Sequence, residues 1–349
     1  MKAHQFKLLS RILREHSGIE LREDQEDLVE AKLRPLLMEL AFPSLAHLTL
    51  ALTKPGNDSL RLRVAQTIAV LESYFFRDRA PFQYFTEVML PRLMERRAAS
   101  RQVRIWCAAT ATGQEPYSLA MLLCDEASKI AGWNIEIVAT DFSEQALTKA
   151  KTGHYTQFEV QRGLPISYLV KYFDESGSGW QIKPAVRNKV VFREHNLLND
   201  CRDLGRFDVI FCRNVLMYFD EALRHAVLSR LAHQLAPDGY LVLGSAETTT
   251  GVSGDFVPVP EGYSGIFCLE SEAARGRKTR PPVRLAAETA AGKPKGASFR
   301  EVRLDRSTAD LLEARARALG LTLAELLAEY AGAPIPSPGH WAAIKTGTR

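Results

Sequence analysis

The sequence has few of the features that indicate a disulfide-stabilised, metal-binding or membrane-spanning protein. Its five cysteines form no CxxC pair and have no histidine at ligand spacing beside them, which favours reduced thiols over a disulfide framework or a zinc site. No apolar run approaches the roughly 20 residues that span a bilayer, and residues 1–14 lack the apolar core of a signal peptide. We therefore expect a cytoplasmic protein with no metal centre and no stable membrane insertion.

An excess of one charge is also missing. Lys and Arg number 45 against 41 for Asp and Glu, so the net charge of +4 does not single out nucleic acid as a partner. The length of 349 residues predicts two or three domains, because a domain typically takes about 100–200 residues.

The spacing of apolar residues changes once along the chain. In residues 1–95, apolar positions such as Phe6 and Leu9 recur at helical spacing, which predicts a small all-α domain. In residues 96–270, short apolar strands alternate with helices, which predicts an α/β domain with a doubly wound, parallel, Rossmann-like sheet.

The expected elements of the α/β domain are strands at 103–108, 135–140, 190–194, 207–211 and 240–243, the last after a turn at 237–239, and helices at 117–130, 143–152 and 221–235. A final antiparallel edge strand is expected at 264–269, and an irregular subdomain at about 153–190. The rest is predicted to be a flexible basic linker (271–297), a small strand–helix–helix module (298–333) and a tail (334–349).

The first strand of the α/β domain runs into a turn rich in small residues, Trp106–Ser118, which lets a ligand approach the backbone closely. This turn has neither the GxGxxG glycines nor a lysine that would hold phosphates. A carboxylate at Glu115 would repel phosphate and attract an amino group or a sulfonium, which favours S-adenosylmethionine over a nucleotide. The alternative is a tight turn followed by an ordinary acid in the first turn of a helix.

Polar residues also follow the next two strands. Asp141 stands where an acid can accept both ribose hydroxyls of an adenosyl group, although Asp141 or Ser143 could instead only cap the next helix. Asn196 could read the adenine edge while Leu197 packs on the ring; the alternative for Asn196 is an ordinary turn residue.

The fourth strand leads into Arg213 and Asn214, at the strand end where open α/β sheets bind ligands. Tyr218 would then lie near the reacting centre, or it is a core aromatic with a satisfied hydroxyl. Upstream, Arg77 could grip a carboxylate of the substrate or of the cofactor, or form an ion pair with Asp78 or Glu72.

These motifs, taken as a set, resemble the CheR family of chemotaxis receptor methyltransferases over about residues 1–270. The matching pieces agree in order and spacing, and they are Ser73–Arg77, Trp106–Ser118, Ala139–Asp141, Asn196–Leu198, Phe207–Asp220 and Gly244–Glu247. The most specific are the Glu-Pro-Tyr-Ser end of the turn and Cys-Arg-Asn-Val followed by Tyr-Phe in the fourth piece.

The resemblance implies an S-adenosylmethionine-dependent protein-glutamate O-methyltransferase that acts on cytoplasmic helices of chemoreceptors. It implies cofactor-binding positions at Ser73, Arg77, Glu115, Asp141, Asn196, Leu197, Arg213 and Asn214. It also implies that Arg77 and Tyr218 border the transferred methyl. A glutamate side chain, with a pKa of about 4.3, is ionised at neutral pH, so this chemistry needs no strong general base. The basic residues Lys32, Arg34, Arg61 and Arg63 of the helical domain are candidates for docking acidic receptor helices, with a solvated charged face as the alternative.

Three departures from the family pattern bear on binding. Leu71 and Ser73 stand where the family often has Asn and Thr, and Gln114 replaces a common Glu, so we expect weaker cofactor affinity at most. Some family members bind a receptor-tail peptide through a Gly-rich loop. The corresponding stretch here, residues 172–191, is short, and we expect no tail tethering.

Residues 298–333 resemble a ribbon-helix-helix module, which dimerises by pairing strands and often binds DNA through them. Glu301 among the strand residues argues against phosphate binding, so nucleic acid is disfavoured but stays open for this module. The alternative is a helical hairpin that docks to a partner. For the whole chain, the alternative function is a regulatory scaffold or sensor that binds the cofactor without transferring its methyl group.

Overall fold

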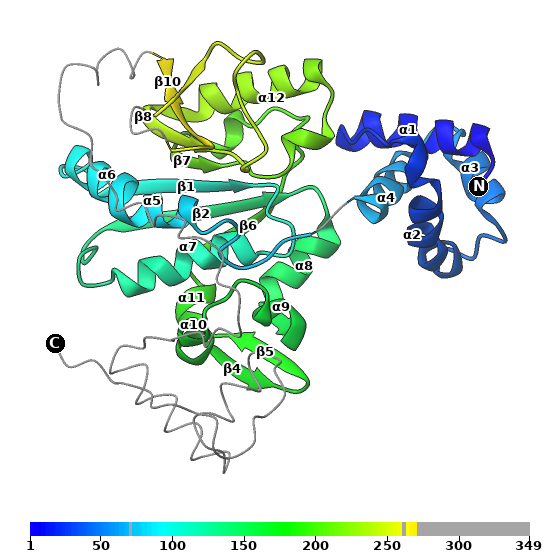
Figure 1. Ribbon diagram of the computed structural model, residues 1–349. Helices are drawn as coiled ribbons and strands as arrows, with labels where there is room; N and C mark the ends of the chain where they lie inside the picture. The colour runs from blue at the N-terminus through cyan, green and yellow to red at the C-terminus, as the bar shows by residue number, and fades with distance from the viewer. Residues whose placement is uncertain (70–71, 260–262, 271–349) are drawn as a thin grey trace, which may run out of the picture. The chain divides into compact units, whose positions relative to one another are not determined.

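The computed structural model describes residues 1–69, 72–259 and 263–270. These residues fall into two compact units, one made of residues 1–153 with 184–270 and the other of residues 154–183, and each is described by itself (Figure 1). The expected linker, strand–helix–helix module and tail at 271–349, and the departure at Leu71, lie outside the described residues. No described helix is both long enough and apolar enough to cross a membrane.

The first unit begins with a helical region, as the sequence predicted. Its helices are α1 (Ala3–Ser17), α2 (Glu26–Glu39), α3 (Leu45–Leu52) and α4 (Asp58–Ile68), with a short 3-10 turn, η1 (Glu23–Gln25), before α2. The apolar positions that recur at helical spacing, among them Phe6, Leu9 and Leu13, are buried in one cluster shared by the four helices. Three further segments precede the sheet: α5 (Ala80–Tyr84), the π-helical η2 (Phe85–Met89) and α6 (Leu90–Arg96).

The sheet of this unit has seven strands in the order β6-β2-β1-β7-β8-β10-β9. The strands are β1 (Gln102–Ala108), β2 (Asn134–Asp141), β6 (Val190–Glu194), β7 (Phe207–Phe211), β8 (Leu235–Val242), β9 (Phe256–Pro258) and β10 (Ile266–Leu269). Strands β6, β2, β1, β7 and β8 are parallel, and β10 is antiparallel to both β8 and β9. The predicted parallel α/β sheet is therefore confirmed.

Two predictions at the end of the sheet are wrong. The expected turn at 237–239 is part of β8, because pairing with β7 starts at Leu235, is irregular, and resumes at Tyr240. Gly239 permits this bulge, since a Cβ there would lie 2.7 Å from the Asp208 carbonyl oxygen. The last strand is not an edge strand, because β9 pairs outside it; β9 has only three residues and contains Pro258, so it gives little sequence signal.

The helices between the strands are α7 (Gln114–Asp125), α8 (Glu144–Thr152), α11 (Pro184–Arg187) and α12 (Glu221–Gln234), with 3-10 turns η3 (Arg202–Leu204) and η4 (Leu216–Tyr218). Helices α7 and α8 pack on β2 and β6, while α12 joins the apolar cluster on the face that carries Trp106. Helix α7 begins at Gln114, three residues earlier than predicted, because Gly113 takes a left-handed conformation (φ 93°) that ends the turn at once. It also ends five residues early, at Asp125, before the turns that lead to Gly132.

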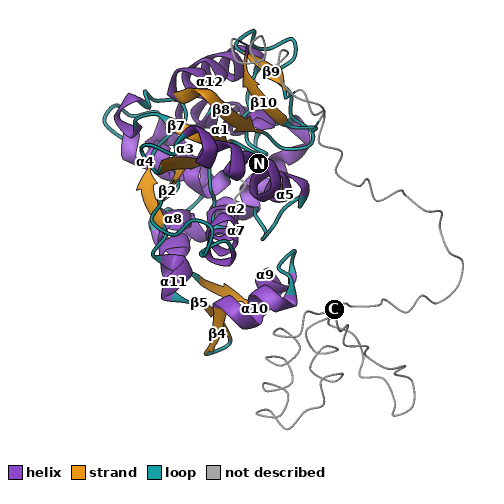
Figure 2. Cartoon of the chain, turned by 90° about the vertical axis from the view of Figure 1, so that its left-hand side faces the viewer, coloured by secondary structure: helices purple, strands orange, loops and turns teal. Residues whose placement is uncertain are grey.

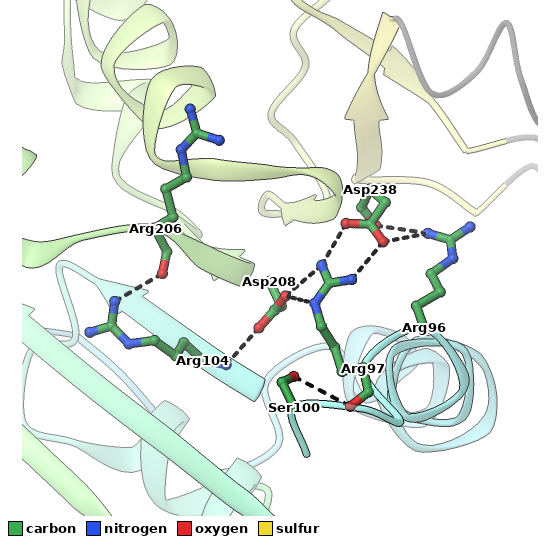
Figure 3. A network of polar contacts seen from close by, with 7 residues as sticks. All are labelled: Arg96, Arg97, Ser100, Arg104, Arg206, Asp208 and Asp238. Carbon is green, nitrogen blue, oxygen red and sulfur yellow. Dashed lines mark hydrogen bonds and ion pairs between the residues drawn. The ribbon is translucent and has the colours of Figure 1, made fainter. Parts of the chain in front are cut away.

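A polar network joins α6 to the amino-terminal side of β7 and to β8 (Figure 3). Arg97 donates to both carboxylate oxygens of Asp238, at 2.9 and 2.5 Å, and its Nε donates to Asp208 at 3.0 Å. Asp208 also accepts the backbone N–H of Arg104, at 2.8 Å, which ties the start of β1 to the same network. The network therefore fixes the end of the sheet where β1 begins.

The second unit, residues 154–183, contains β3 (His154–Thr156), α9 (Gln157–Gln161), α10 (Ile166–Tyr172), β4 (Phe173–Ser176) and β5 (Gly179–Ile182). Its three strands form an antiparallel sheet in the order β3-β5-β4. Figure 2 shows β4 and β5 of this sheet beside α9 and α10. Only Gly177 and Ser178 lie between β4 and β5, so the loop of this hairpin is short.

Candidate functional site

A cavity of about 960 Å³, counted to its open mouth, lies at the carboxyl ends of β1, β2, β6 and β7. Parallel strands end at the same edge of a sheet, and β1 lies between β2 and β7, where the chain order reverses and α/β sheets bind ligands. All nine residues predicted for the site line this cavity: Ser73, Arg77, Glu115, Asp141, Asn196, Leu197, Arg213, Asn214 and Tyr218. The structure thus brings together side chains that are up to 145 residues apart in sequence.

The helical region contributes residues to the cavity wall that no sequence motif indicated. Ser17 and Ile19, at the end of α1, line the cavity beside Tyr218. The Glu20 N–H donates to the Tyr218 carbonyl oxygen at 3.0 Å, and Asn196 Nδ2 donates to the His16 carbonyl oxygen at 2.7 Å. Contacts between a helix end and loops 180–200 residues away cannot be read from local spacing.

Asn196 therefore connects α1 to the loop after β6 and also lines the cavity. Its Nδ2 is used by the end of α1, and its Oδ1 accepts the Leu198 N–H at 3.0 Å, which is an ordinary turn contact. One hydrogen of Nδ2 is left to reach a ligand. Leu197 is buried and lines the cavity next to it.

The turn after β1 is held by Asp141. Asp141 Oδ2 accepts the Ala111 N–H at 2.8 Å, and Oδ1 accepts the Ser143 N–H at 2.9 Å. Ser143 is the residue that caps α8, since its side chain accepts the Ala146 N–H. Burial raises the pKa of Asp141, against the opposing effect of the Ser143, Ala111 and Phe142 backbone N–H groups. A carboxylate has about four lone-pair positions, so Asp141 can still accept a further hydrogen bond.

Glu115 and Arg213 form an ion pair inside the cavity. The Arg213 side chain, only 1% exposed, donates to Glu115 at 3.0 Å and to Asp78 at 2.7 Å. Burial raises the pKa of Glu115, and the Arg213 charge acts in the opposite direction. Two carboxylates share one guanidinium, so the trio keeps a net charge of −1 when ionised, which still favours a cationic group.

Arg77 makes an ion pair with neither Asp78 nor Glu72, because Asp78 is taken by Arg213. The Arg77 guanidinium lies over the Tyr74 ring, 5.4 Å from its centre, and lines the cavity. Its backbone carbonyl oxygen accepts from Arg213 at 2.8 Å, so the segment before α5 is fixed to the end of β7. Asp78 also ties this segment to Arg213, whereas the sequence suggested it only as an ion-pair partner of Arg77.

Unpartnered polar atoms are concentrated at the cavity. In the part of the chain that the structure describes, six buried side-chain polar atoms have no hydrogen-bond partner, and four belong to cavity residues: Thr110 Oγ1, His195 Nε2, Arg213 Nε and Asn214 Oδ1. Buried polar atoms are nearly always hydrogen-bonded in proteins. The wall groups that can still bind a ligand are the Asp141 carboxylate, the Asn196 amide and the Arg77 guanidinium, which suit a ligand that carries several donors and acceptors, as the adenosyl and amino-acid ends of S-adenosylmethionine do.

Backbone strain is concentrated at the same place. Six of the eight non-glycine residues with positive φ among the described residues belong to the segments that form the cavity: Phe76, Asp78, Arg79, Ala109, Ala111 and Asn214. Such conformations cost of order 1–3 kcal/mol each and persist where the surrounding contacts impose them.

Gln114 lies outside the cavity lining. It is 1% exposed, and its Oε1 accepts from the Thr112 hydroxyl at 2.9 Å. Gln114 therefore packs within the turn itself, and its effect on cofactor affinity stays a prediction. Ser73, the other departure in the described residues, does line the cavity.

Residues 71–262 match the family described as "CheR methyltransferase, SAM binding domain". The chain belongs to the CheR family. Chemotaxis protein methyltransferase 1 of Pseudomonas aeruginosa is 38% identical over 271 residues, which cover 75% of this chain and 94% of that protein. Chemotaxis protein methyltransferase Cher2 of Pseudomonas putida is 36% identical over 255 residues, which cover 72% of this chain and 90% of that protein.

Solved methyltransferase structures are more distant. The structure of a DhpI-SAH complex matches 55% of this chain and 72% of that chain at 14% identity with a TM-score of 0.25, a similarity that carries no argument about function. The family match shows the cofactor, which is S-adenosylmethionine.

Proposed function

We propose that this CheR-family protein transfers the methyl group of S-adenosylmethionine to glutamate side chains on cytoplasmic helices of chemoreceptors, and that it acts in the cytoplasm. The observation that carries the proposal is the single cavity in which all nine family positions meet. The chain also covers nine-tenths of curated relatives that are named chemotaxis protein methyltransferases.

The cofactor-binding roles follow from the chemistry of the wall. Asp141, whose carboxylate lines the cavity, accepts a ribose hydroxyl, and Leu197 and Asn196 border the adenine. The net negative trio of Glu115, Asp78 and Arg213 attracts the ammonium group of the cofactor's amino-acid end and its sulfonium. When bound, the cofactor supplies an electrophilic methyl group on a sulfonium.

Transfer needs alignment more than acid–base chemistry. The incoming glutamate is already ionised at neutral pH, so the protein has to orient its carboxylate and exclude water. Arg77, which has no carboxylate partner among the described residues, is placed to hold that carboxylate, and Tyr218 borders the same space.

The four basic residues proposed for receptor docking differ in the contacts that they make within the helical region. Lys32 Nζ donates to the carbonyl oxygens of Ile68 and Ala69, at 2.8 and 2.9 Å, and Arg61 donates to Leu52 and Lys54 carbonyl oxygens. Arg63 pairs with Glu39. Lys32 and Arg61 therefore stabilise the helical region itself, whereas Arg34 makes no hydrogen bond or ion pair of this kind with any residue that the structure describes.

Incubation with labelled cofactor and receptor-bearing membranes tests the proposal. Label should enter the receptor in a base-labile form, as expected for a carboxylic ester. Cofactor binding without transfer to any receptor would refute the enzyme and favour a regulatory cofactor sensor instead.

A further inference from the structure

Glu247 is a buried carboxylate outside the cavity lining. It is 9% exposed and lies in the turn after β8. Among the described residues its carboxylate is met by three backbone N–H groups and by no ion pair with a basic side chain. The three backbone N–H groups offset the cost of burying this carboxylate, and together they hold the side chain in one orientation.

The three N–H groups come from two segments. Glu247 Oε2 accepts from Asn214 and from Gly244, both at 2.7 Å, and Oε1 accepts from Met217 at 3.2 Å. Gly244 belongs to the same turn as Glu247, whereas Asn214 and Met217 belong to the loop that follows β7. One side chain thus holds both ends of the 214–217 loop against the turn after β8.

This loop carries Asn214 and Val215 of the cavity wall, and it is flanked directly by two further wall residues, Arg213 and Tyr218. Asn214 has φ 60°, a left-handed conformation that a non-glycine residue adopts at a cost unless contacts impose it. The Glu247 contact to the Asn214 N–H supplies such a constraint. Gly244 allows the close approach, because a Cβ there would lie 2.8 Å from Glu247 Oε2.

We propose that Glu247 is a positioning residue for methyl transfer: its carboxylate fixes the loop between Arg213 and Tyr218 so that both face the cavity in the geometry that transfer requires. This rests on the proposed function for the role of Tyr218 in transfer. The negative charge of Glu247 is also felt in the cavity, where it raises the pKa of Glu115.

The geometry predicts a specific effect for Glu247→Gln. An amide has one oxygen acceptor and one NH2 donor, so it can keep the two contacts of Oε2 only by turning its NH2 toward the Met217 N–H. The Asn214 end of the loop then stays fixed, and the Met217 end loses its contact with residue 247, which leaves Tyr218 with fewer constraints. We expect kcat to fall roughly 10-fold or more while the Kd for S-adenosylhomocysteine changes less than about 3-fold. Glu247→Ala releases both ends and should weaken cofactor binding as well.

The test combines hydrogen exchange, S-adenosylhomocysteine titration and methyl transfer on the full chain, with the exposed neighbour Thr248→Ala as the matched control. In Glu247→Gln, faster exchange should be confined to the peptide that covers Met217, and Thr248→Ala should behave as wild type. Unchanged exchange and kcat in folded Glu247→Gln would overturn the proposal, as would a loss of folded protein with unchanged kcat per folded molecule.

Glu247→Asp is a second variant for the same test. If Glu247→Gln does not fold, Glu247→Asp keeps the charge on a side chain too short to reach both segments, and the same faster exchange and lower kcat are expected; wild-type behaviour of that variant would overturn the proposal. Exchange and titration need no receptor. A wild-type protein that methylates no receptor would refute the proposed function, whereas the Glu247 contacts are judged by exchange and by cofactor affinity.

Discussion

Arg77 is the residue on which the proposed transfer depends most directly. Because it has no carboxylate partner among the described residues, Arg77→Ala removes no ion pair that stabilises the fold. A lost charged hydrogen bond to the substrate costs about 1.5–3 kcal/mol, so kcat/KM should fall roughly 10- to 100-fold with an unchanged unfolding transition. Arg77→Lys keeps the charge but loses the planar guanidinium, so its kcat/KM should lie between those of wild type and Arg77→Ala. Unfolding of Arg77→Ala would refute this role.

The raised pKa values of Asp141 and Glu115 predict how cofactor affinity depends on pH. Both carboxylates must be ionised to bind the ribose hydroxyls and the cationic end of the cofactor, and burial raises both pKa values above 3.8 and 4.5 respectively. Protonation on lowering the pH therefore weakens binding earlier than for unperturbed acids.

Titration of S-adenosylhomocysteine between about pH 7 and about pH 5 checks this expectation. Affinity should fall as the pH falls, and Asp141→Asn should bind roughly 10-fold more weakly at neutral pH with a shallower pH dependence. An affinity that is the same at both ends of the range would contradict it.

At the scale of single residues, the sequence predicted the cavity wall well and its internal contacts poorly. Position at the carboxyl end of a parallel strand is a local property, so Asp141, Arg213 and Asn214 could be placed from the strand pattern. The pairing of Arg213 with Asp78, 135 residues away, depends on how the chain folds back, and no local pattern encodes it.

Among the elements, the strands with continuous apolar runs were predicted almost to the residue, as β6 and β7 show. The errors lie where backbone geometry decides: at Gly113, which starts α7 early, and at the bulge through 237–239 in β8. The start of α7 depends on a left-handed turn and the bulge depends on the neighbouring strand, and neither can be predicted from the spacing of hydrophobic residues.

Substitution of Arg97, the centre of the polar network in Figure 3, should lower the stability of the fold without changing methyl transfer. Arg97→Met leaves Asp208 and Asp238, with side chains 11% and 22% exposed, without their main cation. Breaking such a pair should lower the free energy of unfolding by about 2–3 kcal/mol, less than for a fully buried pair. Arg96→Met, which removes a 3.6 Å contact to the Asp238 carboxylate and a 3.0 Å hydrogen bond to the Asp238 carbonyl oxygen from a more exposed side chain, is the matched control and should cost only about 1 kcal/mol.

The same network gives the sign of a pH effect on stability. Arg97 lowers the pKa of Asp238 in the folded protein, so the ion pair stabilises the fold above the unfolded-state pKa and that contribution is lost as the pH falls through the folded-state value. The stability difference between wild type and Arg97→Met should therefore shrink in acid, as denaturant unfolding at several pH values can show. A constant difference, or a lower kcat in folded Arg97→Met, would contradict this account.

For the molecule as a whole, the carboxyl-terminal part is the largest region whose role rests on sequence alone. Its resemblance to a strand-pairing module leads us to propose that residues 298–333 mediate self-association. Removal of residues 275–349 should then lower the mass measured by light scattering and leave methyl transfer unchanged. A truncated protein of unchanged oligomeric state would count against the proposal.

The central claim is that the cavity directs a methyl group onto receptor glutamates. Peptide mass spectrometry of a chemoreceptor incubated with the cofactor and either wild-type protein or Arg77→Ala tests it most directly. We predict methyl esters on glutamate side chains of the receptor's cytoplasmic helices with the wild type and a strong reduction with Arg77→Ala. Methylation of another residue type, or no receptor methylation by a wild-type protein that binds the cofactor, would contradict the claim.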